Sequence, residues 1–385
     1  MKDAILVIST NATRTGTPIL LLNNLRWLKE NTKYELVIIL EKGGELIGEF
    51  EQLGRVFLWN RLMPAGLNGE HRTLTRLFAR VKAKINVRKM IGSIQKVCNV
   101  RLIFSNSSRN GMILPLMRRN FKVKVLTYVH EGERILRLWD SQGLVRNSFD
   151  QSDAFLAVSE FVKKTLIAEF GIGKNIEVVP GYLQLPVGIE IKHELKNEIG
   201  LSPEMKVLLV CGWLDWHKGA DIFIHLAKKM SETRNDVCLV WLGGKQDDIY
   251  FRHLMFDVQK MGLSERVRII PPKTNALDYM SDADIVLMLS REESFSLVTI
   301  EAGLLGKPVL CFDKTGGPCE IVGYDRRFVI PYLDIHRMEK RILELLDNQD
   351  EAKEMGRDLK KRVSGMYTED ISGRKLIASI EKLMN

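Results

Sequence analysis

Short apolar runs alternate along the chain with longer stretches in which apolar residues recur at helical spacing. The runs in the first half are rich in Val, Ile and Leu and are typical of buried strands: 4–9, 34–40, 56–59, 102–105, 123–129 and 154–158. Helices are predicted between them, for example over 18–30 and in a segment that Ser159 caps and Gly171 ends. Strands that are apolar on both faces and alternate with helices predict a parallel sheet covered on both sides.

The same alternation starts again after Pro203, with strand-like runs at 207–211, 237–242, 266–270, 285–289 and 308–312. Between the two series, 182–204 mixes Pro, Gly and charged residues, which is typical of a hinge. We therefore predict an α/β fold of two doubly wound, Rossmann-like parallel-sheet domains, over 1–185 and 204–366, joined by a linker at 186–203. Ligands of such sheets bind at the carboxyl ends of the strands, and two facing domains create a cleft for a small molecule.

Composition excludes several classes of protein. Apolar residues make up 45% of the chain and charged residues 27%, the balance of a globular protein rather than a disordered one. No apolar run is long enough to span a bilayer, and the run at the N-terminus is too short for a secretory signal. The five cysteines form no Cys-x-x-Cys pair, which favours reduced thiols in a cytoplasmic protein.

Positive charge is concentrated in the first half of the chain. Residues 1–190 carry 28 Lys and Arg against 17 Asp and Glu, whereas 191–385 carry 29 against 31. The region 71–124 contains no acidic residue, and Gly92 argues against one unbroken helix there. Its apolar residues at helical spacing are Leu74, Leu77, Phe78, Val81 and Ile85. Such a segment is either a basic amphipathic helix that meets an anionic membrane or substrate, or a packed helix with a basic outer face. No zinc-finger or RNA-binding signature accompanies the charge, so nucleic acid is not predicted as a partner.

Two loops that join a strand to a helix are candidates for binding phosphate. Gly16 precedes the first helix and lies in neither a dinucleotide-binding fingerprint nor a P-loop, so an ordinary turn is an equal alternative. Lys218, in the segment 212–219, has the same placement in the second domain. There an ammonium group and a helix N-terminus would together suit a diphosphate, although a Lys-Gly pair alone is a weak signal.

The strongest local pattern is Ser-Arg-Glu-Glu-Ser-Phe-Ser-Leu-Val-Thr-Ile-Glu-Ala-Gly at 290–303. Glu293 follows an apolar strand, and Glu301 lies one to two turns into the next helix. A carboxylate can accept hydrogen bonds from vicinal hydroxyls of a sugar, and the N–H groups of 294–297 can face negative charge. On spacing alone, two solvated glutamates remain the alternative. Asp282 and Asp284 precede a strand and are expected to cap and turn the chain rather than to bind metal.

These segments together resemble a GT-B glycosyltransferase, specifically the retaining family-four group of bacterial capsule and O-antigen transferases. The segment 281–322 resembles that family's Glu-x7-Glu signature, its Gly-x-Pro-Val strand and the Gly-Gly-x-x-Glu loop that follows. Weaker matches in the expected order are ATRTGTPILLLNNLRWLKE, EKGGEL, TYVHEGE and DAFLAVSEFVKKTL. The resemblance covers nearly the whole chain and implies that 367–385 is a helix crossing back to the N-terminal domain.

The resemblance also implies roles for individual residues. Lys218 would neutralise the leaving diphosphate, and Gly16 would approach that group from the other domain. His130 would line the pocket of the donor sugar. Glu301 would hold the ribose of the nucleotide. The donor sugar would be contacted by Glu293 and by the backbone of Ser294, Phe295, Ser296, Leu297 and Val298. Such enzymes usually need neither a metal nor another cofactor.

The resemblance implies a retaining, metal-independent enzyme of the hexosyltransferase type. It would transfer a sugar from a nucleotide-diphosphate donor to a lipid-linked or polysaccharide acceptor. The product would be a cell-surface glycan such as lipopolysaccharide, capsule or exopolysaccharide. The enzyme would be cytoplasmic, either free or peripheral on the inner face of the plasma membrane through 71–124. The family usually has Arg where Trp213 stands, with His217 or Arg14 as substitutes here. That departure motivates an alternative, a sugar-nucleotide-binding protein of low or no activity. A second alternative is a transferase acting on a small soluble acceptor.

Overall fold

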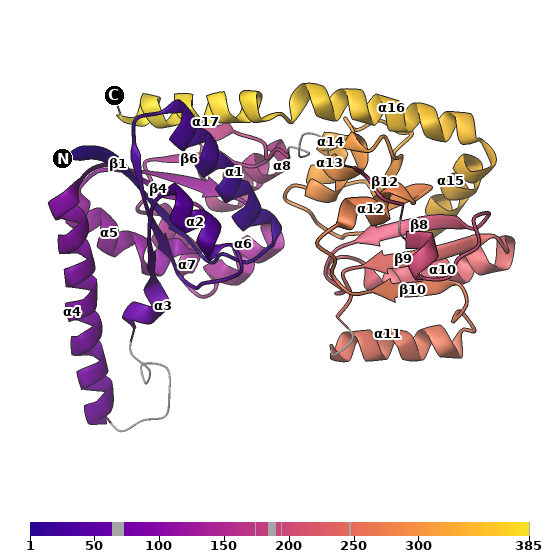
Figure 1. The fold of residues 1–385 in the computed structure, drawn as a ribbon, viewed down its shortest axis with the longest axis horizontal. Coiled ribbons are helices and arrows are strands. Elements are labelled where there is room, and N and C mark those ends of the chain that lie inside the picture. The colour runs from indigo at the N-terminus through magenta and orange to yellow at the C-terminus, as the bar shows by residue number, and fades with distance from the viewer. Residues whose placement is uncertain (64–72, 174, 184–189, 194, 246–247, 385) are drawn as a thin grey trace. The chain divides into compact units, whose positions relative to one another are not determined.

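The computed structural model of the 385-residue chain describes every residue except 64–72, 174, 184–189, 194, 246–247 and 385, with only the backbone given for 73–77 (Figure 1). The chain divides into two compact units. The first comprises Met1–Gly181 together with Glu369–Asn385, and the second comprises Tyr182–Thr368.

The first unit is built on a seven-stranded sheet in which all the strand pairs are parallel, with the order β3-β2-β1-β4-β5-β6-β7. The strands are β1 (Lys2–Ser9), β2 (Glu35–Leu40), β3 (Arg55–Leu58), β4 (Cys98–Ser105), β5 (Lys124–Val129), β6 (Ala154–Ala157) and β7 (Ile176–Val178). In the central strand β1, every residue from Ala4 to Ile8 is fully buried. Helices cover both faces, which explains why these runs lack a polar side.

The helices of this unit begin and end where local chemistry favours it. Their bounds are α1 (Gly16–Asn31), α2 (Ile47–Leu53), α3 (Trp59–Leu62), α4 (Thr73–Val97), α5 (Leu114–Phe121), α6 (Glu133–Asp140), α7 (Leu144–Phe149), α8 (Glu160–Phe170) and α17 (Glu369–Met384), with a short 3₁₀ turn at Asn110–Met112. Ser159 caps α8 by accepting a hydrogen bond from the N–H of Val162, and Gly171 ends the helix with φ of 67°. Helix α17 packs on α1, where Gly373 lies so close to the ring of Trp27 that a Cβ would come within 2.3 Å of it.

Helix α4 differs from the prediction at Gly92. It runs unbroken through Gly92, and the apolar residues Phe78, Val81 and Ile85 face solvent. The side chains of Leu74 and Leu77 lie outside the described residues. The residues that face the core instead form a second stripe with helical spacing along the helix: Ala79, Ala83, Val87, Met90, Ile91 and Ile94. Val87, Met90, Ile91 and Ile94 of this second stripe pack into the core beside the sheet, so the predicted stripe is not the packed face of the helix.

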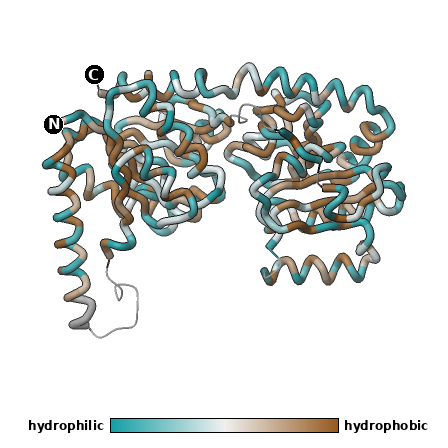
Figure 2. Tube along the Cα trace, viewed as in Figure 1, coloured by the Kyte–Doolittle hydropathy of each residue, from teal (hydrophilic) through white to brown (hydrophobic). Residues whose placement is uncertain are grey.

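The second unit contains a six-stranded parallel sheet in the order β10-β9-β8-β11-β12-β13. Its strands are β8 (Lys206–Cys211), β9 (Val237–Leu242), β10 (Val267–Ile270), β11 (Ile285–Met288), β12 (Val309–Phe312) and β13 (Val329–Ile330). Its helices are α9 (Leu195–Glu198), α10 (Ala220–Thr233), α11 (Ile249–Lys260), α12 (Ala276–Ser281), α13 (Leu297–Leu304), α14 (Gly317–Ile321), α15 (Ile335–Asp347) and α16 (Gln349–Met366). The predicted fold class, two doubly wound parallel-sheet α/β domains, is confirmed. Hydrophobic residues concentrate in the strands of both sheets (Figure 2).

Part of the segment 186–203, expected to be a linker, is packed into the second unit. Helix α9 lies within it, and Leu195 is fully buried in the core of that unit. Asp282 accepts hydrogen bonds from the N–H groups of Leu195 and Lys196, at 2.9 and 3.4 Å, while Asp284 accepts one from Val207 at 2.8 Å. These two aspartates therefore hold backbone groups, as their position before β11 suggested.

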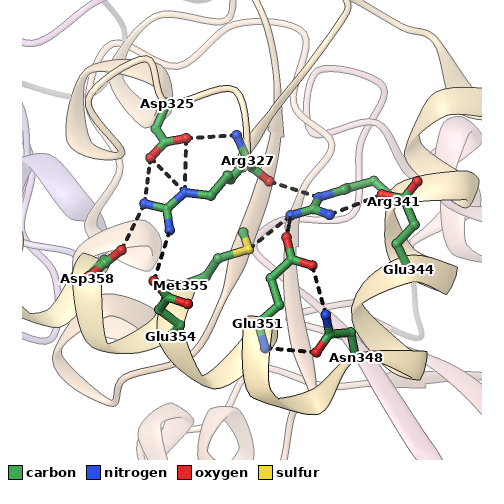
Figure 3. A network of polar contacts seen from close by, with 9 residues as sticks. All are labelled: Asp325, Arg327, Arg341, Glu344, Asn348, Glu351, Glu354, Met355 and Asp358. Atoms are coloured by element: carbon green, nitrogen blue, oxygen red, sulfur yellow. Dashed lines mark hydrogen bonds and ion pairs between the residues drawn. The ribbon is translucent and has the colours of Figure 1, made fainter.

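Two arginines connect the last helices of the second unit (Figure 3). Arg327, in the loop before β13, forms ion pairs with Asp325 and with Asp358 of α16, both at 2.8 Å. Arg341 of α15 pairs with Glu351 of α16 and donates a hydrogen bond to the carbonyl of Arg327 at 3.2 Å. This network connects α15 and α16 to each other and to the loop before β13.

Candidate active site

The loops at the carboxyl edge of the second sheet lie unusually close to one another at two glycines. The N–H of Gly212, directly after β8, donates a hydrogen bond to Leu242 of β9 at 2.9 Å. A Cβ at Gly243, directly after β9, would come within 2.3 Å of the Gly212 carbonyl oxygen. Gly243 also has φ of 121°, a conformation open mainly to glycine. The absence of a side chain at Gly243 therefore allows the loops after β8 and β9 to touch here.

Lys218 and Glu293 form an ion pair at this edge. The loop after β8 is shaped by Asp215, which accepts a hydrogen bond from the N–H of Lys218 at 2.8 Å. Gly219 then approaches β11 so closely that a Cβ would lie 2.2 Å from the Leu289 carbonyl oxygen. This approach brings the Lys218 ammonium to the Glu293 carboxylate, which also accepts a hydrogen bond from Ser290 at 2.7 Å. The Glu293 side chain is only 8% exposed, so Lys218 and Ser290 replace hydrogen bonds that its carboxylate would otherwise make with water.

The backbone around Glu293 is held by the loop after β12. Glu293 accepts a hydrogen bond from the N–H of Gly317 at 2.8 Å and donates one to Thr315 at 2.6 Å. A Cβ on Gly317 would lie 2.6 Å from the Cα of Phe295. The Gly-Gly pair at 316–317 therefore allows direct backbone packing against 293–295, which places the first turn of α13 beside the ion pair.

The five residues from Ser294 to Val298 form the entry to α13, and their side chains are largely used inside the protein. Ser296 caps the helix by accepting a hydrogen bond from Thr299 at 3.1 Å. The ring of Phe295 packs against Tyr367, with ring centroids 5.8 Å apart. The N–H groups of Leu297 and Val298 belong to the first helical turn, where N–H groups have no partner within the helix. The backbone, rather than the side chains, is therefore the part suited to a ligand.

Glu301 lies farther along α13, and burial raises the pKa of its carboxyl to about 7. The charge of Glu301 also contributes to the raised pKa of the Cys211 thiol at the end of β8, although burial is the larger cause there. This coupling places Glu301 near the end of β8, from which the Lys218 loop departs. The structure thus brings Lys218 and Glu293 into contact and puts Glu301 at the same edge of one sheet.

Trp213, where a family Arg was expected, is half exposed and has a cation beside it. The Nζ atom of Lys245 lies 4.8 Å from the centroid of the Trp213 indole. Of the two suggested substitutes, Arg14 belongs to the first unit and pairs with Glu49 at 3.1 Å, whereas His217 lies in the loop that carries Lys218. Lys245 was missed in the sequence, where its only signal is its position after Gly243-Gly244 at the end of a strand.

In the first unit, Gly16 is the first residue of α1, with Thr15 as the capping residue in extended conformation. The preceding loop is ordered by Asn11, whose side-chain oxygen accepts hydrogen bonds from the N–H and the hydroxyl of Thr13 at 3.1 and 2.7 Å. A Cβ at Gly44 would come within 2.3 Å of Ala12, so a neighbouring loop packs directly on this one. Gly16 therefore lies at the carboxyl edge of the first sheet, on an ordered turn.

His130 follows β5 at the same edge and is buried. Its Nε2 atom lies 2.9 Å from the side-chain oxygen of Asn106. Because the amide nitrogen of Asn106 faces the Ser9 hydroxyl at 3.5 Å, that oxygen accepts the hydrogen bond and Nε2 carries the proton. Burial lowers the pKa of His130 to about 3, so the ring is neutral, and its Nδ1 atom has no hydrogen-bond partner among the described residues.

A buried polar cluster surrounds His130 that the sequence reasoning missed. Glu131 accepts hydrogen bonds from the Ser107 hydroxyl at 2.6 Å and from the Ser108 N–H at 3.3 Å, and burial raises the pKa of its carboxyl. Asn110 donates to the carbonyl of Ile8 at 3.1 Å. The available signal was the polar run Asn-Ser-Ser-Arg-Asn at 106–110, directly after the buried strand β4.

In the part of the chain that the structure describes, no group of three or more His, Cys, Asp or Glu side chains is placed to share a metal ion. None of the helices in the described ranges combines the length and the hydropathy that a membrane span requires.

The chain is similar in sequence and in fold to known glycosyltransferases. Residues 191–362 match the family described as glycosyl transferases group 1. The chain is 24% identical over 268 residues, 68% of each protein, to the N-acetyl-alpha-D-glucosaminyl L-malate synthase of Bacillus anthracis. It is 34% identical over 124 residues, 31% of this chain and 29% of the relative, to a D-inositol 3-phosphate glycosyltransferase of Jonesia denitrificans.

Among solved structures, Anabaena Alr3699/HepE in complex with UDP and glucose aligns over the full length of both chains with a TM-score of 0.78 and 17% identity. Sucrose-phosphate synthase from Thermosynechococcus elongatus aligns over 100% of this chain and 99% of its own with a TM-score of 0.79 and 16% identity. At this identity the likeness establishes the fold. Residues 191–362 therefore resemble the glycosyl transferases group 1 family, within a chain that has the two-domain parallel-sheet fold of GT-B glycosyltransferase structures.

Proposed function

We propose that the protein is a retaining glycosyltransferase that moves a sugar from a nucleoside diphosphate donor to a lipid-linked or polysaccharide acceptor during synthesis of a cell-surface glycan. The observation that carries the proposal is the Lys218–Glu293 ion pair beside the first turn of α13. A cation, a carboxylate and unpaired N–H groups at the carboxyl edge of one sheet match the needs of a diphosphate joined to a sugar.

In this proposal the donor replaces interactions that the free protein makes with itself. The diphosphate takes the Lys218 ammonium from Glu293, and the freed carboxylate accepts hydrogen bonds from hydroxyls of the sugar. The N–H groups of Leu297 and Val298 face the phosphate oxygens, and Glu301 accepts the hydroxyls of the ribose. From the first unit, Gly16 approaches the diphosphate and the unpartnered Nδ1 of His130 accepts a hydrogen bond from the sugar.

The reaction breaks the bond between the anomeric carbon and the phosphate oxygen. The acceptor oxygen attacks the same face, which retains the anomeric configuration, and the leaving phosphate takes the acceptor's proton. Lys218 and the helix N-terminus stabilise the developing negative charge, so the proposal includes no metal and no other cofactor. Lys245, seated on Trp213, adds a second positive charge at this edge, which supports an active enzyme rather than a silent binding protein.

For the acceptor, the proposal places the enzyme in the cytoplasm at the inner face of the plasma membrane, with the basic region 71–124 toward anionic lipid. The exposed residues Phe78, Val81 and Ile85 of α4 support this placement. A small soluble acceptor is the second candidate, favoured by the similarity to an N-acetyl-alpha-D-glucosaminyl L-malate synthase and a D-inositol 3-phosphate glycosyltransferase.

The test is a panel of UDP-, GDP- and ADP-sugars, read by thermal shift and by slow release of the nucleoside diphosphate in EDTA. We expect one donor to raise the melting temperature and to be hydrolysed, with Lys218→Ala reducing release and exposed Lys353→Ala leaving it unchanged. Proton NMR of the transferred sugar would show the donor's anomeric configuration. Absence of both binding and release across the panel, or an inverted product, contradicts the proposal.

A further inference from the structure

A cavity of about 600 Å³ lies on the flank of the first unit, between α3, α4 and α5. Arg80, Lys84 and Arg88 reach it from α4, and Arg119 reaches it from α5. Its apolar lining comes from Trp59, Met63, Val87, Ile91 and Leu116. None of these residues belongs to the candidate active site, so the cavity needs an explanation of its own.

The four cations are not neutralised by the protein. Within the described residues, none of them forms an ion pair, and α4 contains no acidic residue. Arg80, Lys84 and Arg88 are spaced four residues apart, so they face the same side of the helix and repel one another. An anion in the cavity would remove this repulsion, and a phosphate group offers enough oxygens for several donors at once.

The neighbouring face of α4 is apolar and exposed to solvent. Phe78, Val81 and Ile85 are 74%, 48% and 47% exposed. At about 100° per residue, their mean direction lies roughly a quarter of a turn from that of the three cations that line the cavity. A helix with exposed apolar residues flanked by Arg and Lys is the kind that lies in the headgroup region of an anionic membrane. In Figure 1, α4 runs along the outside of the first unit and extends past the sheet.

Positive charge continues beyond the cavity. Arg119 also lines a second hollow of about 1030 Å³, together with Arg101, Lys122 and Lys124. Asp153, the acidic residue lining that hollow, already pairs with Arg118 at 2.9 Å and Lys124 at 3.5 Å. One flank of the unit therefore presents a continuous basic surface to any anionic layer.

We propose that this cavity binds an anionic membrane phospholipid, with the phosphate among Arg80, Lys84, Arg88 and Arg119 and the upper acyl chain on the apolar lining. The exposed stripe of α4 enters the headgroup region beside it. A free phosphate would satisfy the cations but would leave both apolar surfaces in water, which favours a lipid as the source of the phosphate. This inference rests on the membrane placement in the proposed function and not on the donor chemistry.

The first experiment measures co-sedimentation of the full chain with phosphatidylcholine vesicles, with and without phosphatidylglycerol. We expect binding only to the anionic vesicles, weakened roughly 100-fold by Arg80→Ala/Lys84→Ala/Arg88→Ala, since each cation near an anionic surface contributes about a factor of five. The matched control is Lys353→Ala/Arg357→Ala/Lys360→Ala, which removes three exposed cations from α16 in the other unit. Equal losses in the two triple variants would overturn the proposal.

The second experiment separates a lipid from a soluble phosphate. Phe78→Ser/Ile85→Ser changes exposed residues only, so it should fold normally, and we expect it to weaken vesicle binding while all four cavity cations remain. Unchanged vesicle binding by this variant, or displacement of the wild-type protein from vesicles by millimolar glycerol phosphate, would overturn a lipid occupant. Donor hydrolysis measured without vesicles should be the same in all the variants, so failure here is distinguishable from failure of the proposed chemistry.

Discussion

Replacement of Glu301 by Gln should remove a pH dependence from donor binding. Burial raises the pKa of this carboxyl to about 7, against 4.5 for an ordinary Glu. In the proposed site the carboxylate accepts two ribose hydroxyls, and only its ionised form can accept both. Donor binding must therefore favour loss of the proton, and the affinity must depend on how much of Glu301 is already ionised.

The size of the effect follows from the pKa. With a pKa of about 7, roughly one-tenth of Glu301 is ionised at pH 6 and roughly nine-tenths at pH 8, so affinity should rise about tenfold between them. Binding at pH 7 should release about half a proton. In the free protein the same shift disfavours the ionised form by about 3 kcal/mol. The pKa of Glu301 is higher in the folded than in the unfolded protein, so the protonated carboxyl favours the folded state. This contribution to the unfolding free energy is fully present below about pH 4 and is lost as the pH rises through 7.

The assay is calorimetric titration with the sugar nucleotide selected by the panel, at pH 6, 7 and 8 in two buffers of different ionisation enthalpy. A sugar nucleotide is suitable because its diphosphate diester does not titrate in this range. Glu301→Gln should bind more weakly at pH 8 and with the same affinity at every pH, and the exposed Glu354→Gln should behave as wild type. A tenfold pH dependence that persists in Glu301→Gln would refute the reasoning.

Three further substitutions test local features of the two units. Ser296→Ala removes the cap of α13 and should lower the unfolding free energy of the second unit by about 1 kcal/mol in urea, and no change would contradict the capping role. Gly317→Ala places a methyl group 2.6 Å from the Cα of Phe295, so a loss of about 1–3 kcal/mol with weakened donor binding is expected, and wild-type behaviour would show that the loop packing is loose. Asn106→Asp offers a carboxylate to the Nε2–H of His130 and should raise its pKa from about 3 toward the ordinary range. A ¹⁵N-detected histidine titration would show this change, and an unaltered titration would contradict the assigned hydrogen bond.

Much of the fold could be predicted because each buried strand is an apolar run that ends at a polar or glycine residue. Strand β9 occupies 237–242, as the pattern indicated, and Ser159 and Gly171 bound α8 as their chemistry favours. These are local features, since the side chain that caps or ends an element lies within a few residues of it.

Features that depend on contacts distant in the sequence could not be predicted. The packed face of α4 could not be predicted because two apolar stripes share one helix and only contacts with the rest of the unit decide between them. Lys245 lies beside Trp213, and Asn106 is hydrogen-bonded to His130. In each pair the two residues are more than twenty positions apart and follow adjacent parallel strands, so there was no local signal for the contact in the sequence. The Lys218–Glu293 pair was easier to anticipate because both residues follow strands of one sheet.

The most direct test of the account is the rate of nucleoside diphosphate release by Glu293→Ala, compared with wild type and with the exposed control Glu354→Ala. If Lys218 and Glu293 bind the reacting end of the donor, release should fall by roughly 100-fold or more, while the far-ultraviolet circular dichroism spectrum stays unchanged. A rate for Glu293→Ala within about twofold of the control would place the chemistry elsewhere and contradict the central claim.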